Sequence, residues 1–209
     1  MMSCIRRTTW LLGAILAAAV LLTGCGGPSA SLRVNDKLVA QFPPDARAWV
    51  YDAENEVIIA LDNRDAAKVK IEEIEKDIER AKATVTAAKG RGGKGEDPAK
   101  ARVAWHEARR DHAEALLEAA EVSVICARAS LELAKAKLVV RFDVLGEEKK
   151  FSVKGFEKQH ERCARNLLAR GRDADKLRDK AKKAEGGWRK ARSQFVRSTG
   201  DHDHGLWID

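Results

Sequence analysis

The segment from Ala101 to Val140 carries two mostly apolar stripes instead of one, and this feature constrains the fold most strongly. Residues in each stripe are spaced alternately by three and four, the spacing of one face of an α-helix. A helix with two such faces needs two neighbours to cover them. The first seam comprises Ala101, Trp105, Ala108, His112, Ala115, Ala119, Val122, Cys126, Ala129, Leu133, Ala136 and Val140. The second seam comprises Ala113, Leu117, Ala120, Val124, Ala127, Leu131, Ala134 and Leu138.

The segments on either side each carry a single stripe of the same spacing. One runs from Val50 to Ala88, after Pro43-Pro44 and a capping Asp45, and the other runs from Val153 to Phe195. The glycine-rich run 90–95 separates the first of these from the central segment, and we expect a second turn near Gly146. Two helices are therefore available to cover the two seams.

Composition supports long helices over a wide globular core. Aromatic residues make up only 5% of the chain and charged residues 34%. We predict an all-α fold, an elongated antiparallel three-helix coiled-coil bundle over residues 45–198, with helices at about 45–89, 98–143 and 152–198 and a flexible tail at 199–209. Glycines 171, 186 and 187 are expected to weaken or bend the third helix, because each costs about 1 kcal/mol relative to alanine.

Antiparallel pairing gives a testable register for each hairpin. A bend between residues 144 and 145 places the first seam against the third helix and pairs Val122 with Leu167, Leu133 with Phe156, Trp105 with Ala184 and Cys126 with Cys163. A bend in the glycine-rich run pairs Ile74 with Leu117 and Ile71 with Ala120. The first register predicts a disulfide between Cys126 and Cys163, although two free cysteines would also fit as small buried seam residues.

The first 24 residues have the pattern of an export signal. Arg6-Arg7 precedes an uncharged apolar run from Trp10 to Leu22, which is short for a membrane span. The tetrad Leu22, Thr23, Gly24 and Cys25 follows it and resembles the lipobox of bacterial lipoprotein precursors. An ordinary cleaved signal with a chance cysteine is the alternative.

The lipoprotein resemblance implies cleavage before Cys25 and acylation of Cys25, with signal-peptidase recognition by Leu22, Thr23 and Gly24. Gly26 stands where enterobacterial inner-membrane retention signals have Asp, so the periplasmic face of the outer membrane is favoured. Export to an oxidising compartment, with Cys25 lipidated, would leave Cys126 and Cys163 as a pair. Residues 25–44 are expected to form a tether, in which 32–39 is at most a weak strand.

Other candidate chemical sites are weak. His202 and His204 lie in the tail segment Asp201-His-Asp-His204, which is a poor metal site because it lacks a rigid framework. His106, His112 and His160 form no ligand pair at helical spacing, and the run 90–95 lacks the spacing and the hydroxyl residue of a phosphate-binding loop. We expect no enzyme activity, no metal and no cofactor.

Charge is distributed unevenly along the chain. Residues 45–89 contain 8 basic and 11 acidic residues, whereas 145–197 contain 17 basic and 8 acidic. Either the first and third helices pair across their flanks, or the third helix meets an anionic surface such as lipid headgroups, lipopolysaccharide or peptidoglycan. Loss of Arg6 and Arg7 leaves 37 basic and 32 acidic residues, too small an excess to indicate nucleic acid.

These observations together predict a non-enzymatic, lipid-anchored envelope protein. Its coiled coil would serve as a periplasmic scaffold, spacer or docking element, bound to the membrane through its lipid and to another envelope protein or peptidoglycan, with a homo-oligomer left open. The alternatives are a holdase-type periplasmic chaperone and a helical-hairpin adaptor of an efflux or secretion system.

Overall fold

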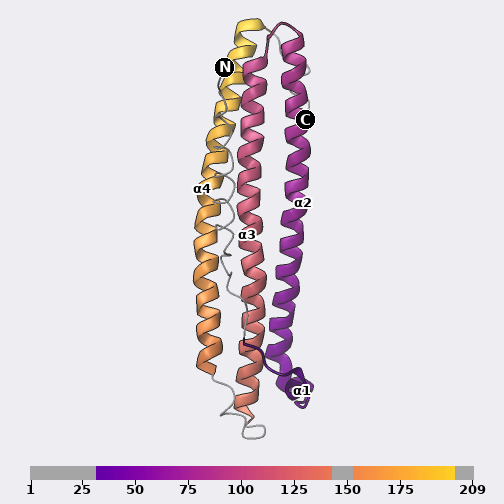
Figure 1. The fold of residues 1–209 in the computed structure, drawn as a ribbon, viewed down its shortest axis with the longest axis vertical. Helices are drawn as coiled ribbons and strands as arrows, with labels where there is room; N and C mark the ends of the chain where they lie inside the picture. Colours follow the sequence, from indigo (N-terminus) through magenta and orange to yellow (C-terminus); the bar gives the residue numbers. More distant parts are fainter. Residues whose placement is uncertain (1–31, 143–152, 201–209) are drawn as a thin grey trace, which may run out of the picture.

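The computed structural model describes residues 32–142 and 153–200, and in these ranges the chain is helical without strands. The elements are α1 (Asp36–Val39), a 3₁₀ turn η1 (Pro44–Arg47), α2 (Ala48–Gly90), α3 (Glu96–Arg141) and α4 (Val153–Thr199). The three long helices lie side by side and antiparallel, with α3 in the middle (Figure 1). The predicted all-α, elongated three-helix architecture is confirmed, and the helix ends fall within three residues of the predicted ones.

The three long helices form a nearly flat array. α3 packs along its length on both α2 and α4, whereas α2 and α4 make almost no contact with each other. The spacing of the two seams explains this arrangement, because buried Val122 of the first seam and buried Val124 of the second are two residues, or about 200°, apart around the helix. The helices on the two seams therefore lie on nearly opposite sides of α3.

The turn between α2 and α3 depends on glycine conformations. Gly92, Gly93 and Gly95 have φ values of 79°, 80° and 83°, in the left-handed region that other residues rarely adopt. Gly95 directly precedes α3, whose first turn carries Glu96, Asp97 and Pro98. The glycine-rich run thus closes a tight helical hairpin, as expected.

The register between α2 and α3 agrees with the predicted one only in part. Ile74 and Ile78 of α2 form a buried cluster with Ala113 of α3, and Ile78 with Ala113 is a pair of the predicted register. Arg109, which the same register places opposite Lys82, instead bonds Asp77 at 3.2 Å. An alanine-rich seam accepts several registers, so its spacing alone does not fix the alignment.

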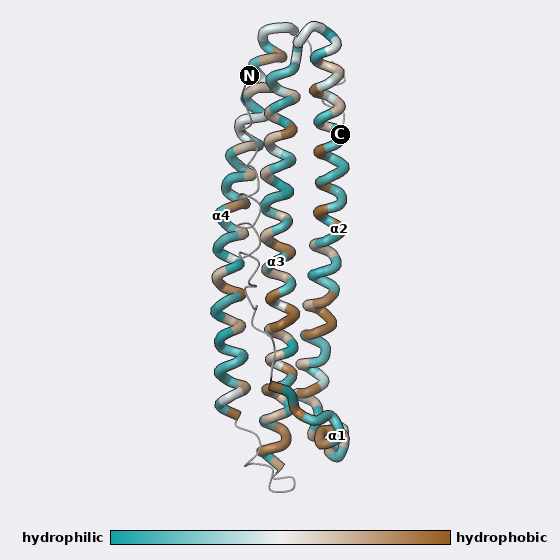
Figure 2. Tube along the Cα trace, viewed as in Figure 1, coloured by the Kyte–Doolittle hydropathy of each residue, from teal (hydrophilic) through white to brown (hydrophobic). Residues whose placement is uncertain are grey.

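α4 is a single helix that passes through Gly155, Gly171, Gly186 and Gly187 without interruption. It is also the most hydrophilic of the long helices (Figure 2). Buried Phe156, Cys163, Ala174 and Ala181 lie in one stripe and face α3. α4 is therefore held by one face only, at the edge of the array.

The segment before α2 folds onto the base of the array, which corrects the expectation of a tether for residues 32–44. Val34, Val39 and Phe42 are buried in one cluster with residues of all three long helices, namely Val50 of α2, Ala136, Leu138 and Val139 of α3, and Phe156 of α4. The expected weak strand is absent from the described part of this segment, where Asn35 instead caps α1 by accepting a hydrogen bond from Lys37 N. We call residues 32–42 the basal strap.

Polar contacts hold the basal strap in addition to its apolar side chains. Lys135 Nζ lies 2.7 Å from Asp36 Oδ1 and 3.2 Å from Glu132 Oε1, and Val34 N donates to Glu132 Oε2 at 2.6 Å. Burial opposes the charge on Lys135, but the hydrogen bonds and charges of Asp36 and Glu132 outweigh it and raise the pKa of Lys135. The strap therefore compensates a lysine that is buried on α3.

Several predicted features lie outside the described residues. These are the signal segment 1–24 with Leu22, Thr23 and Gly24, the lipidation residue Cys25, the turn near Gly146, and the tail 201–209 with His202 and His204.

Candidate functional site

A disulfide joins the two helices of the second hairpin near the middle of the array. Cys126 of α3 and Cys163 of α4 are bonded, with an S–S distance of 2.01 Å and Cα atoms 5.4 Å apart. Cys163 is only 1% exposed, and its Sγ lies 3.7 Å from the carbonyl oxygen of Val122. The predicted bridge and the predicted register of α3 against α4 are confirmed at this level.

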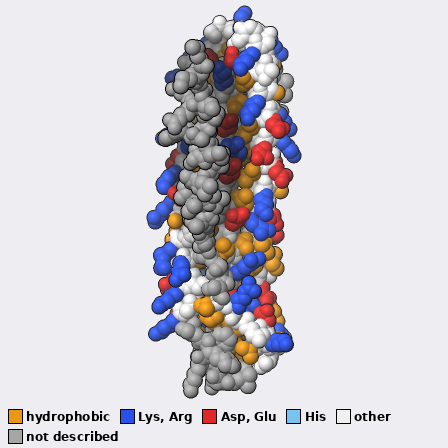
Figure 3. Space-filling view, viewed as in Figure 1, with side chains coloured by type: hydrophobic (Ala, Val, Ile, Leu, Met, Phe, Trp, Pro, Cys, Tyr) orange, Lys and Arg blue, Asp and Glu red, His pale blue; other side chains and the backbone are white. Residues whose placement is uncertain are grey.

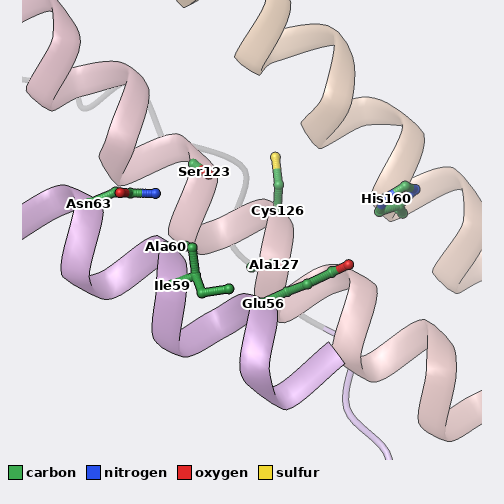
Figure 4. Close-up of a pocket in the computed structure, with 8 residues that line it drawn as sticks. All are labelled: Glu56, Ile59, Ala60, Asn63, Ser123, Cys126, Ala127 and His160. Atoms are coloured by element: carbon green, nitrogen blue, oxygen red, sulfur yellow. The ribbon is translucent and has the colours of Figure 1, made fainter. Parts of the chain in front are cut away.

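An open groove of about 300 Å³ lies beside the disulfide, between the two edge helices. Its walls include Glu56, Ile59 and Asn63 of α2 and His160 of α4, while Ser123 and Cys126 of α3 form its floor (Figure 4). The groove exists because α2 and α4 stay apart. It lies on the face opposite the basal strap, since Ser123 and strap-bound Glu132 are nine residues, or about 180°, apart on α3.

Aromatic and charged side chains form a second lock toward the α2–α3 turn. Trp105 of α3 stacks on Trp188 of α4, and the guanidinium carbon of Arg109 lies 5.2 Å from the centre of the Trp105 ring. His106, only 3% exposed, has its Nδ1 3.0 Å from Arg109 Nη1 and 3.9 Å from Asp77 Oδ2. This network ties α2, α3 and α4 together at one level.

The periodicity that defined the second seam also locates these polar residues. Continued toward the N-terminus, the second seam passes through Ala99, Arg102, His106 and Arg109, of which the first three are buried. The apolar seam ends at Ala113, because the next positions at the same spacing are occupied by Arg and His. Sequence analysis therefore missed a polar extension of the seam.

Ion pairs between the long helices connect each edge helix to α3. Asp77–Arg109, Lys82–Glu107 and Lys89–Glu96 join α2 to α3, and Glu118–Arg170 and Asp111–Lys180 join α3 to α4. In the described ranges α2 and α4 make almost no packing contact with each other. Of the two explanations for the charge asymmetry, pairing of the first and third helices across their flanks is therefore not supported, because α3 separates α2 from α4.

The charged side chains that make α2 and α4 differ therefore lie on the outer edges of the array, where they face the surroundings. Lys and Arg side chains project along the α4 edge, whereas Asp and Glu side chains are interspersed with Lys and Arg along the α2 edge (Figure 3). The basic edge of α4 consists of exposed residues opposite its buried stripe: Lys154, Lys158, Arg165, Arg172, Lys176, Lys183, Lys190 and Arg197. These edges are the most distinctive candidate interaction surface in the described part of the chain.

The described ranges hold neither a cluster of metal-binding side chains nor a helix suited to span a membrane. Residues 32–142 and 153–200 contain no group of three or more His, Cys, Asp or Glu side chains placed to hold a metal ion. None of the helices described there is long and apolar enough to cross a membrane. His160 lies at the wall of the groove, partly buried, in agreement with its position on the α4 seam.

Comparisons with known proteins gave no relative. No protein-family model matches the chain. No curated protein and no solved structure matches it either. Inferences about function therefore depend on the sequence and the geometry described above.

Proposed function

We propose that this chain is a lipid-anchored protein of the bacterial cell envelope whose helical array is a non-enzymatic scaffold, spacer or docking element. The membrane-attached residue is Cys25, at the end of the lipobox-like tetrad, and the array projects into the periplasm, from the outer membrane by the resemblance at Gly26. The lipoprotein resemblance implies three acyl chains on Cys25, two in a diacylglyceryl group on its thiol and one on its amine. Three such chains would hold the protein on a membrane essentially permanently.

The observation that carries the proposal is the distance over which the array separates its two ends. The basal strap fixes the start of the described chain to one end, and the α2–α3 turn lies at the other (Figure 1). The 43 residues of α2 rise by 1.5 Å each, so these ends are about 65 Å apart. A protein anchored close to the basal strap would present the turn far from the membrane.

The disulfide supports export to an oxidising compartment. Structural disulfides are typical of exported proteins and rare in the reducing cytosol. Cys126 and Cys163 join two helices that already pack along their whole length, so the bridge reinforces the rigidity of one hairpin. Rigidity over this length is the property that a spacer requires.

Lipidation is tested by replacing the acceptor residue in the full-length chain. Cys25→Ser is expected to abolish incorporation of labelled palmitate and to release the protein from the membrane fraction. Cys4→Ser, which removes a cysteine from the signal segment, is the matched control. It is expected to retain palmitate incorporation and membrane association. Palmitate labelling that persists in Cys25→Ser would refute the anchor.

The spacer role is tested by photocrosslinking from the two ends of the array. A photoreactive residue at Lys94, in the exposed α2–α3 turn, is expected to capture envelope components that a residue at Arg33, in the basal strap, does not. Adducts to peptidoglycan are recognised by their release with a muramidase. Identical adducts from both positions would mean that the array does not hold its ends at different depths.

A further inference from the structure

We infer that the basic edge of α4 binds the acidic edge of α2 on a second copy of this chain, so that arrays associate side by side in a parallel row. This inference goes beyond the proposed function, because it follows from the positions of side chains on the two edges and does not require the lipid anchor. Within one chain α3 keeps these two edges apart, so each is available to a neighbour.

Cross-helix contacts give the relative heights of the edges. Asp77 of α2 bonds Arg109 of α3, and two residues further along α3 Asp111 bonds Lys180 of α4, so Asp77 and Lys180 lie at one level. The groove is bordered by residues 56–63 of α2 and by Cys126 of α3, which is bonded to Cys163 of α4. Asp77 and Lys180 differ by 103 residues, as do Ala60 in the middle of that α2 segment and Cys163, so a residue of α2 is about level with the residue of α4 that is 103 positions later.

Charges on the two outer edges are complementary at equal heights. Exposed Asp62 and Glu73 of α2 are level with exposed Arg165 and Lys176 of α4. One further level pair is of opposite charge with the signs exchanged, Lys76 of α2 and Asp179 of α4, whereas the next, Arg80 and Lys183, is of like charge. Three level pairs of opposite charge thus favour a parallel alignment.

Large apolar side chains at the same edges support an interface. Ile58 and Val69 of α2 are 55% and 54% exposed, and Leu168 of α4 is 65% exposed. All three lie opposite the buried stripes of their helices, and Leu168 is level with Asp65, about one turn from Val69. A neighbouring array would cover these side chains, which the described part of the chain leaves exposed.

Partners within the chain do not preclude these contacts. Lys176 bonds Asp173 at 2.8 Å and Glu73 bonds Lys70 at 2.7 Å, but these are exposed pairs within one helix turn. Such pairs contribute little stability, so the side chains can exchange partners when a second array approaches.

The symmetry of the interface determines what it builds. The α2 edge of one copy meets the α4 edge of the next, so the contact is heterologous and the two ends of a row keep one free α2 edge and one free α4 edge. Parallel copies at equal height all have their basal straps on one side. Lipid anchors in one membrane would hold the copies in that same alignment.

Charge reversal in the full-length chain tests the pairing. One variant, Asp62→Lys with Glu73→Lys, makes the α2 edge basic, and a second, Arg165→Glu with Lys176→Glu, makes the α4 edge acidic. Each alone is expected to lower the yield of chemically crosslinked oligomers in cells about tenfold, because two attractions become repulsions. Lys137→Glu, at an exposed site on the central helix, is the control and is expected to leave the yield unchanged.

Rescue distinguishes a specific interface from a general effect of charge. The four-substitution chain and a mixture of the two defective variants are both expected to recover crosslinking, since an altered edge again meets an opposite charge in each case. A photoreactive residue at Leu168 is expected to crosslink to residues 58–76 of another copy. Absence of rescue with unchanged circular dichroism, or Leu168 adducts confined to a different protein, would overturn the inference, whereas loss of palmitate labelling bears only on the proposed anchor.

Discussion

Trp105 of α3 and Trp188 of α4 stack with their ring centroids 4.8 Å apart and their planes inclined by only 8°. The pair lies one helical turn beyond the predicted match of Trp105 with Ala184, because the large rings reach past the backbone positions that the register aligns. Together with the Cys126–Cys163 disulfide, it fastens α4 to α3 at two separate levels.

A double-mutant cycle measures the tryptophan pair. Trp188→Ala is expected to reduce the free energy of unfolding by about 2 kcal/mol, less than for a fully buried tryptophan because Trp188 is only half-buried. The coupling energy between Trp105→Ala and Trp188→Ala should be about 1 kcal/mol, as for other aromatic pairs. Trp49→Ala, at a site 44% exposed, is the control and should cost less than the Trp188 change in the same denaturant titration.

The disulfide is expected to contribute about 4 kcal/mol to stability, because it closes a loop with a sequence separation of 37 residues. Replacement of both Cys126 and Cys163 by serine should lower the midpoint of thermal unfolding by a corresponding amount while the helix content at room temperature is retained. Mass spectrometry of the non-reduced, alkylated protein checks the bond directly. Two alkylated thiols in the exported protein would contradict it.

Two glycine substitutions should have opposite effects. Gly92 has φ +79°, so Gly92→Ala is expected to destabilise the protein by about 1 kcal/mol, although no atom lies within 4 Å of the added Cβ. Gly187 is inside α4 with open space around it, so Gly187→Ala should stabilise by about 1 kcal/mol through helix propensity alone. Chemical denaturation of both variants provides the comparison, and equal signs would contradict the left-handed turn.

His112 should make stability depend on pH in the mildly acidic range. Burial first, and then the positive charge of Arg178, lower the pKa of His112, while Asp175 opposes them. The unfolded chain then binds a proton more readily than the folded one. The contribution of His112 is therefore complete above its ordinary pKa of about 6.5 and is lost as the pH falls through its lower folded value.

Urea denaturation at a series of pH values between about 7 and 5 should show this loss of stability for the unmodified protein. His112→Gln is expected to flatten the dependence because it removes the titrating group. Arg178→Met should reduce the slope without abolishing it, since burial remains. An unchanged slope in His112→Gln would assign the effect to other groups.

Long-period patterns in the sequence were sufficient to predict the helices and the disulfide. Seam residues recur over 40 or so positions, so the ends of α2, α3 and α4 follow from where the pattern starts and stops. Cys126 and Cys163 each occupy a seam position, and the short connection between α3 and α4 leaves few registers that join them. Both predictions depended on seam residues that recur along each helix, so one misassigned position changes them little.

Features that depend on one long-range contact were not predicted. The basal strap has no period, and its folding is determined by Glu132 and Lys135, about 100 residues later in the chain. The two-residue offset between Val122 and Val124 implies a flat array, but the predicted bundle left open whether the first and third helices touch. Charged residues at seam spacing, such as Arg102 and His106, were hidden by the search for apolar side chains.

The basal strap also determines how the protein would respond to mechanical load. Tension on the chain ahead of Leu32 reaches α4 through Gln159, to whose Oε1 the Leu32 N–H donates, and reaches α3 through Glu132 and Lys135. Tension is therefore transmitted to α3 and α4 before it reaches α2, although α2 is the next long helix in the sequence. Without the strap the same force would peel α2 away from one end, one turn at a time. With it, the load is divided among three helices, two of which are covalently joined at Cys126 and Cys163.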